Sequence, residues 1–135
     1  MVAAVGSAVP GDLTIVAECG DDLLGFAHTV RDADPTWGAL LDNLHVGHEF
    51  KRLGIGAQLL KETAGHFLAH RWPCAPYLWV LVQNTWAQAF YESPGGRRVE
   101  RIIAGPFPGG GHAPFFRYAW PDIAVIAERD HVEQR

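Results

Sequence analysis

Apolar and polar residues alternate along the first third of the chain in the pattern of β-strands. Leu13–Cys19 and Leu23–Val30 are rich in apolar and β-branched residues, and the polar turn Gly20–Asp22 separates them. Two such runs around a tight polar turn predict a β-hairpin. The charged residues, proline and glycine of residues 31–38 then predict a loop.

Leu40–Val46 is the third predicted strand. Because successive side chains of a strand point to opposite faces, Leu44 and Val46 share one face, and Asn43 and His45 share the other. This strand therefore brings two polar side chains to one surface of the sheet.

After this strand, residues at spacings of three and four predict an amphipathic helix from about Gly54 to Arg71. Pro73 and Pro76 end the helix. Its inward stripe consists of Leu59, Leu60, Thr63, Ala64, Phe67 and Leu68.

The unbroken apolar sequence of Tyr77–Val82 predicts a buried strand. Asn84 is the predicted N-cap of a short helix, which Ser93–Gly96 ends. The inward face of this helix consists of Ala87, Phe90 and Tyr91.

Val99–Ile103 and Phe115–Trp120 are the last predicted strands, and the Gly- and Pro-rich residues 105–114 connect them. The tail, residues 121–135, forms either a frayed helix or no ordered structure. The order of elements predicts a mixed, largely antiparallel α/β fold with a right-handed parallel strand–helix–strand crossover at its centre. With 135 residues, the chain has the length of a single domain, residues 1–135.

Composition limits the classes of function. Apolar residues make up 48% of the chain, enough for a core, and the net charge of −4 disfavours nucleic acid as a partner. No apolar run has the ~20 residues of a membrane span and no signal peptide is recognisable, so we expect a cytoplasmic protein with no membrane partner. Cys19 and Cys74 are expected to be buried thiols. Core or interface positions are expected for Trp72, Trp79, Trp86 and Trp120.

Lys51–Gly56 carries the first candidate chemistry, because it lies between the third strand and the long helix. Gly54 and Gly56 permit close backbone approach, and the free N–H groups and dipole of a helix start favour an anion. Lys51 and Arg52 add positive charge. The segment fits a binding site for a pyrophosphate group. The alternative interpretation is a glycine-rich turn that binds no ligand. The signatures of a P-loop and of a dinucleotide fingerprint are both missing from it.

Two motifs resemble those of the GNAT superfamily of N-acetyltransferases. The stretch from Leu44 to Leu60 resembles motif A, Gln/Arg-x-x-Gly-x-Gly/Ala, and the stretch from Val80 to Gly95 resembles motif B, Asn-x-x-Ala-x-x-Phe-Tyr-x-x-x-Gly. The motif B matches are Asn84, Ala87, Phe90, Tyr91 and Gly95. With their strands and helices, the motifs occupy about residues 40–71 and 77–96, in the order that the family has.

Three features depart from the family pattern. Lys51 stands where Gln or Arg is usual, and Gly96 replaces an aromatic residue, which would remove a core contact. GNAT domains usually begin with a strand and two helices that help to wall the acceptor site, but only about 12 residues precede the first predicted strand. We therefore expect a short variant, a chain whose start is missing, or a wall supplied by a partner, and an exposed apolar sheet would favour a homodimer.

The resemblance implies transfer of an acetyl group from acetyl-CoA, the acyl-donor substrate, to a primary amine by direct attack in a ternary complex. The pantetheine arm would pair with Leu44–Val46, and the Val46 N–H would stabilise the oxyanion. Asn84 would contact the arm or hold the two splayed strands. Tyr91 would protonate the departing thiolate, since a phenol has a reference pKa of about 10. The implied acetyl-CoA-binding residues are Leu44, Val46, Lys51, Arg52, Leu53, Gly54, Ile55, Gly56, Ala57, Asn84 and Tyr91.

The base that deprotonates the amine is less evident. Leu40 and Leu41 stand where the family often has a glutamate, and Asp42 is close in sequence. His45 is the residue of suitable type nearest the expected reaction centre, and Asn43 on the same face would position a water. The catalytic residues that the resemblance implies are therefore Tyr91 and His45.

Other readings stay open. The acceptor is a small amine, an amino acid, an aminoglycoside or a peptide N-terminus. The rival function is a catalytically weak or inactive CoA-binding domain that acts as a sensor or partner subunit. The missing glutamate and the short start of the chain favour this rival function. Glu62, His66 and His70 have the spacing of metal ligands, but a solvated helix face has it too, and we expect no metal.

Overall fold

The computed structural model describes residues 2–5, 12–72 and 76–128. The strands are β1 (Val2–Val5), β2 (Leu13–Cys19), β3 (Asp22–Asp34), β4 (Gly38–Val46), β5 (Tyr77–Leu81), β6 (Arg97–Ala104) and β7 (Ala113–Ala119). The α-helices are α1 (Ile55–Ala69), α2 (Thr85–Glu92) and α3 (Ala124–Glu128), and a 3-10 turn, η1, spans His48–Phe50.

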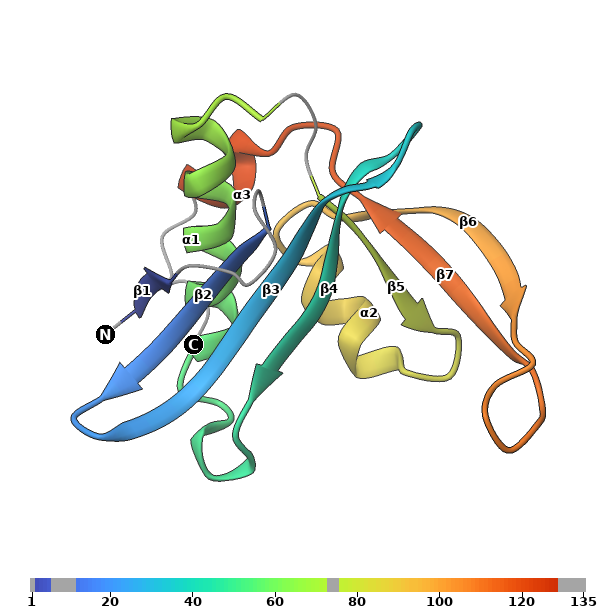
Figure 1. Cartoon of the computed structure of the whole chain (residues 1–135), viewed down its shortest axis with the longest axis horizontal. Helices are drawn as coiled ribbons and strands as arrows, with labels where there is room; N and C mark the ends of the chain where they lie inside the picture. The colour runs from blue at the N-terminus through green and yellow to red at the C-terminus, as the bar shows by residue number, and fades with distance from the viewer. Residues whose placement is uncertain (1, 6–11, 73–75, 129–135) are drawn as a thin grey trace.

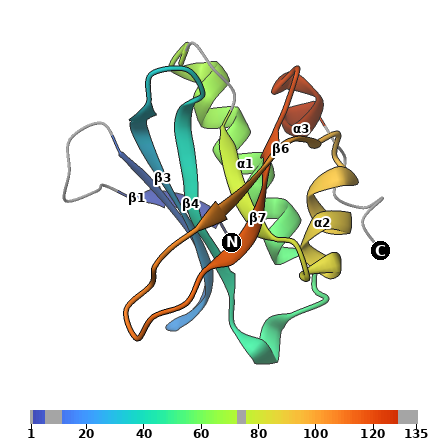
Figure 2. The ribbon, with the colours of Figure 1, turned by 90° about the vertical axis from the view of Figure 1, so that its right-hand side faces the viewer.

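The strands form one sheet in the order β1-β2-β3-β4-β5-β7-β6. Neighbouring strands are antiparallel except β4 and β5, which run parallel on either side of the α1 crossover. Figure 2 shows α1, α2 and α3 on the same side of the sheet. No helix of the described residues covers the other side, which we call the open face. The predicted mixed α/β fold with a parallel crossover is therefore confirmed.

The core lies between the sheet and α1. Leu13, Ile15 and Ala17 are buried along β2, as their alternation predicts, and they pack in one cluster with Leu59 and Leu60 of α1. Full burial of each such leucine contributes about 1.5–3 kcal/mol. The predicted helices, and the predicted strands other than the second, have ends within two residues of those observed.

The predicted loop at residues 31–38 is too long, because only residues 35–37 form a turn. β3 continues to Asp34, which pairs with Gly38 at the start of β4. The Asp34 carboxylate accepts hydrogen bonds from the N–H groups of Thr36 at 2.7 Å and Trp37 at 2.8 Å. These two bonds close the turn and lower the pKa of the Asp34 carboxyl. The sequence misleads because this end of the hairpin stands in water and needs no apolar alternation.

Both ends of the chain hold elements that the sequence did not specify. β1, which was not predicted, pairs antiparallel with β2 from Val2–Ala17 to Val5–Thr14. At the other end, the described part of the tail includes α3, which buries Ile126 in the main cluster. A four-residue strand and a five-residue helix are too short to give a clear period in the sequence.

Several side chains differ from expectation in their burial. Cys19 is exposed at the end of β2, contrary to the prediction of a buried thiol, and Cys74 lies outside the described residues. Trp120 is buried as expected, but Trp86 is 73% exposed and is not a core residue. Gly96 removes no core contact, because a Cβ there would lie 2.4 Å from the Tyr91 carbonyl oxygen and 3.1 Å from the Trp120 ring. Among the described helices, none has the length and apolar character of a membrane span.

Candidate active site

β4 and β5 separate after a short parallel contact. In the described chain they pair only at Leu40–Tyr77. Figure 1 shows the two strands diverging from there toward the ends from which α1 and α2 begin. The ladder between β3 and β4 shifts register at Asp42, since Thr29 pairs with Leu41 and His28 with Asn43. We call the β4 edge from Leu41 to Val46 and the β5 edge from Leu78 to Leu81 the splayed edges.

The backbone of β4 presents polar groups to the splayed edges. The Gly47 N–H donates to the Leu24 carbonyl at 2.8 Å, so this position of the ladder is hydrogen-bonded. Hydrogen-bonded and non-hydrogen-bonded pairs alternate in an antiparallel ladder. Gly25–Val46 and Ala27–Leu44 are therefore non-hydrogen-bonded pairs. The N–H and C=O groups of Leu44 and Val46 point away from β3, toward the side of β5.

The first turn of α1 suits an anion. Gly54 is its N-cap with φ 77°, and no side chain caps the helix start or places an acid in the first turn. The first bond within the helix runs from the Gln58 N–H to the Gly54 carbonyl, so the N–H groups before Gln58 have no carbonyl partner in the helix. Lys51 and Arg52 are exposed just ahead of this turn.

α1 and α2 meet beside the splayed edges. A Cβ on Gly56 would lie 3.2 Å from the Phe90 ring and 3.6 Å from the Leu44 side chain, so glycine permits this three-way contact. Asn84 caps α2 as predicted, because its side-chain oxygen accepts a hydrogen bond from the Ala87 N–H at 3.1 Å. Its amide N–H groups stay available as donors.

Tyr91 lies on the inward face of α2, as predicted, and packs against the core cluster. Its ring makes edge contacts with Phe90, at 5.0 Å between centroids, and with Trp120, at 6.1 Å. Burial raises the pKa of the Tyr91 hydroxyl to about 12. The hydroxyl is therefore a proton donor at any ordinary pH.

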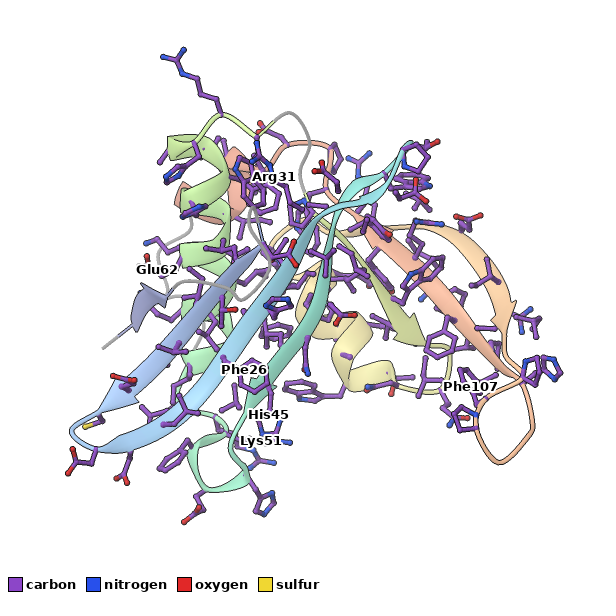
Figure 3. The ribbon with its side chains drawn as sticks, viewed as in Figure 1. Phe26, Arg31, His45, Lys51, Glu62 and Phe107 are labelled. Atoms are coloured by element: carbon purple, nitrogen blue, oxygen red, sulfur yellow. The ribbon has the colours of Figure 1, made fainter. Side chains whose placement is uncertain are left out.

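His45 and Asn43 are exposed on the open face, as predicted. The ring of His45 lies 5.8 Å from that of Phe26, its partner across the β3–β4 ladder, and Figure 3 shows the two side chains together above Lys51. His28 of β3 pairs with Asn43, and its Nδ1 lies 2.8 Å from the Thr14 hydroxyl. The alternation of β3 predicts which face of the sheet His28 lies on. The sequence does not predict the register that places His28 opposite Asn43 of β4.

A second cluster on the open face surrounds Arg117 of β7. The guanidinium carbon lies 4.1 Å from the Trp79 ring centroid and 4.9 Å from that of Trp37. Its Nε donates to Glu100 at 2.6 Å, while Nη1 is buried with no hydrogen-bond partner in the described chain. This cluster ties the tip of the β3–β4 hairpin to β5 and β7. No local pattern predicts this cluster, because its residues come from four separate elements.

The residues predicted for the site thus fall into four neighbouring places. Leu44 and Val46 line one splayed edge, the residues from Lys51 to Ala57 lead into α1, and His45 lies on the open face. Asn84 and Tyr91 come from α2, behind the diverging strands in Figure 1. Within the described chain, Glu62, His66 and His70 are not part of any cluster that could hold a metal, and the two imidazole rings stack at 3.9 Å.

Comparison with known proteins identifies the family. Residues 7–95 match the acetyltransferase (GNAT) family, which is more than half of the chain. The chain belongs to the GNAT acetyltransferase family. Comparison with curated proteins finds no match to this GNAT chain.

Solved structures agree with the GNAT fold. The IAA acetyltransferase from Bacillus cereus is 15% identical with a TM-score of 0.71, covering 89% of this chain and 97% of that one. The ribosomal-protein-S18-alanine N-acetyltransferase from Escherichia coli is 24% identical, with a TM-score of 0.68 and coverage of 84% and 70%. A GNAT family acetyltransferase from Elizabethkingia anophelis with acetyl-CoA bound is 12% identical, with a TM-score of 0.68 and coverage of 89% and 96%. At these identities the likeness concerns the fold.

Proposed function

We propose that this chain transfers an acetyl group from acetyl-CoA to a primary amine, by direct attack of the amine in a ternary complex. The observation that carries the proposal is the direction of the N–H and C=O groups of Leu44 and Val46. These groups point away from β3, at a part of the β4 edge that does not pair with β5. A pantetheine arm carries amides that pair with such groups. The same edge leads to the uncapped, acid-free first turn of α1, which suits a pyrophosphate.

The donor-binding residues act mainly through their backbone. The N–H groups from Arg52 to Ala57, including those of Leu53 and Ile55, would hold the pyrophosphate, and Lys51 adds charge beside it. The Leu53 side chain is 68% exposed and is not needed for this role. Gly54 and Gly56 keep the approach open. Asn84 would donate its free amide N–H groups to the pantetheine arm.

The chemistry divides among three groups. The Val46 N–H donates to the thioester carbonyl oxygen as negative charge develops on it, when the amine nitrogen bonds to the carbonyl carbon. His45 takes the proton that the amine loses, directly or through a water that Asn43 positions. As the carbon–sulfur bond breaks, Tyr91 gives its proton to the sulfur. The products are the acetylated amine and the free CoA thiol.

The rival proposal is a CoA-binding domain without transferase activity. It is favoured by Leu40 and Leu41, which are half-buried and buried where a carboxylate is common in the family. Tyr91 favours the enzyme, because its raised pKa keeps the hydroxyl protonated. The homodimer predicted from the uncovered sheet and the cytoplasmic location stay predictions, as does the identity of the acceptor, whether small molecule or peptide.

A thiol-release assay separates the two proposals. The chain is incubated with acetyl-CoA and a panel of small amines, amino acids, aminoglycosides and peptides, and free CoA thiol is measured. We expect amine-dependent release, which Tyr91→Phe lowers by about 10²–10⁴-fold while the chain still binds acetyl-CoA. Tyr77→Phe, which removes another buried phenol, is the matched control and should keep the rate. Binding of acetyl-CoA with no release for any amine would favour the rival.

A further inference from the structure

Trp86 is a large aromatic side chain that the fold leaves in water. It lies in the first turn of α2 and is 73% exposed, more than any other large apolar side chain in the described chain. An aromatic side chain usually stabilises a fold through the burial of its ring. Because Trp86 is exposed, it adds little to the stability of the isolated chain. The proposed function given above does not use this residue.

The Trp86 ring is nevertheless held in a fixed direction. It stacks on Phe90, one helical turn later, with centroids 5.5 Å apart and planes 9° apart. Phe90 in turn contacts the first turn of α1, 3.2 Å from the Cβ position of Gly56. Phe90 and Trp86, which we call the aromatic platform, thus run from the α1–β4 contact out to the surface.

The outer end of the aromatic platform lies on the side where the phosphates are proposed to bind. β4 and β5 are parallel, so α1 and α2, which follow them, both begin at the same end of the sheet (Figure 1). Trp86 lies nearer the start of α2 than Phe90, so it is displaced from Gly56 toward that end. Lys51 and Arg52 precede α1 at the same end, and Figure 3 shows Lys51 there.

A flat, exposed, pre-oriented indole beside a phosphate cradle fits a purine base. CoA carries its adenine on the far side of the pyrophosphate from the pantetheine arm, and a base stacks well on an aromatic ring. We propose that Trp86 stacks on the adenine of CoA and so selects the complete donor over one that lacks adenosine. This inference rests on the proposed function, because it uses the donor site described there.

Calorimetric titration with two ligands tests the inference. CoA and 4′-phosphopantetheine share the arm, but only CoA has the adenosine. We expect Trp86→Ala to weaken CoA binding by about tenfold, the lower part of the range for base–aromatic stacking, and to leave 4′-phosphopantetheine binding unchanged. Trp86→Phe keeps an aromatic face and should weaken CoA binding by less than half as much on a logarithmic scale. Val99→Ala, an exposed apolar change on β6, is the control and should alter neither Kd.

Each other outcome overturns the inference in a recognisable way. An equal loss for both ligands would mean that Trp86 supports the shape of α2. Unchanged CoA binding, with a lower molar mass of Trp86→Ala in light scattering, would mean that Trp86 covers a second copy of the chain. If 4′-phosphopantetheine binds but Trp86→Ala leaves CoA unaffected, the stacking fails while the donor site stands. If the wild-type chain binds neither ligand, the proposed function itself fails.

Discussion

Gly25 lies directly opposite Val46 in the β3–β4 ladder, and replacing it with alanine tests the role of the Val46 backbone. A Cβ at Gly25 would lie 2.5 Å from the His45 carbonyl oxygen and 3.2 Å from the Val46 Cα. Both neighbours are backbone atoms, so no side-chain rotation relieves the contact. β4 has to move by about 1 Å to restore an ordinary van der Waals distance.

The expected cost differs between stability and catalysis. Overpacking costs about 1–3 kcal/mol, and the reduced entropy of the unfolded chain returns about 0.4–1 kcal/mol. The net loss of about 1–2 kcal/mol lowers Tm by roughly 3–7 °C for a chain of this length. A shift of about 1 Å at an oxyanion donor costs about 10²-fold in kcat. Binding of acetyl-CoA should weaken only about two- to tenfold, the effect of one backbone hydrogen bond.

The assay compares Gly25→Ala with Gly20→Ala, using the best amine from the thiol-release panel. Gly20 has φ 62° and no atom within 4 Å of its Cβ position, so alanine there adds backbone strain without pressing on β4. Both variants should lose comparable stability, but only Gly25→Ala should lose kcat. If Gly25→Ala keeps its kcat within about twofold while its Tm falls as far as that of Gly20→Ala, Val46 is not a donor at the reaction centre.

Three further predictions, two substitutions and one pH profile, each depend on a single residue. Arg52 has φ 70°, a backbone conformation that costs a residue with a side chain about 1–2 kcal/mol. Arg52→Gly should therefore raise the free energy of unfolding in a urea titration while it weakens CoA binding several-fold. A fall in both the free energy of unfolding and the affinity for CoA would contradict this. Since burial raises the pKa of Tyr91 to about 12 and the hydroxyl donates only below its pKa, the pH profile of kcat should show no alkaline loss from this group up to about pH 11. Gly96→Ala places a Cβ 2.4 Å from the Tyr91 carbonyl oxygen and should cost about 1–3 kcal/mol, and an unchanged Tm would show that α2 shifts freely.

The long helix and its approach could be predicted from the sequence because each depends on local pattern. The stripe of α1 follows from its spacing, and the glycines of Lys51–Gly56 mark the turn before it. Asn84 was predicted to cap α2 because a capping side chain acts on a backbone N–H three residues later. These features need no knowledge of which strands are neighbours.

The rest of the site depends on register, which the sequence does not specify. Whether Val46 points its N–H at β3 or away from it changes with a shift of one residue in the ladder. The contacts of His45 with Phe26, and of Gly25 with the β4 backbone, depend on the same register. The Arg117 cluster joins Trp37 and Trp79 across elements that are distant in the chain, and no local pattern marks it.

A thermal-shift measurement with acetyl-CoA, free CoA and ATP in parallel tests most directly whether this fold holds a CoA-type donor. A ligand at about 100 times its Kd adds about 2.7 kcal/mol to stability, roughly 9 °C for a chain of this length. We predict a shift of this size with acetyl-CoA and with CoA and none with ATP, because only the CoA ligands carry a pantetheine arm for Leu44 and Val46. No shift with either CoA ligand, or an equal shift with ATP, would contradict the donor site proposed here.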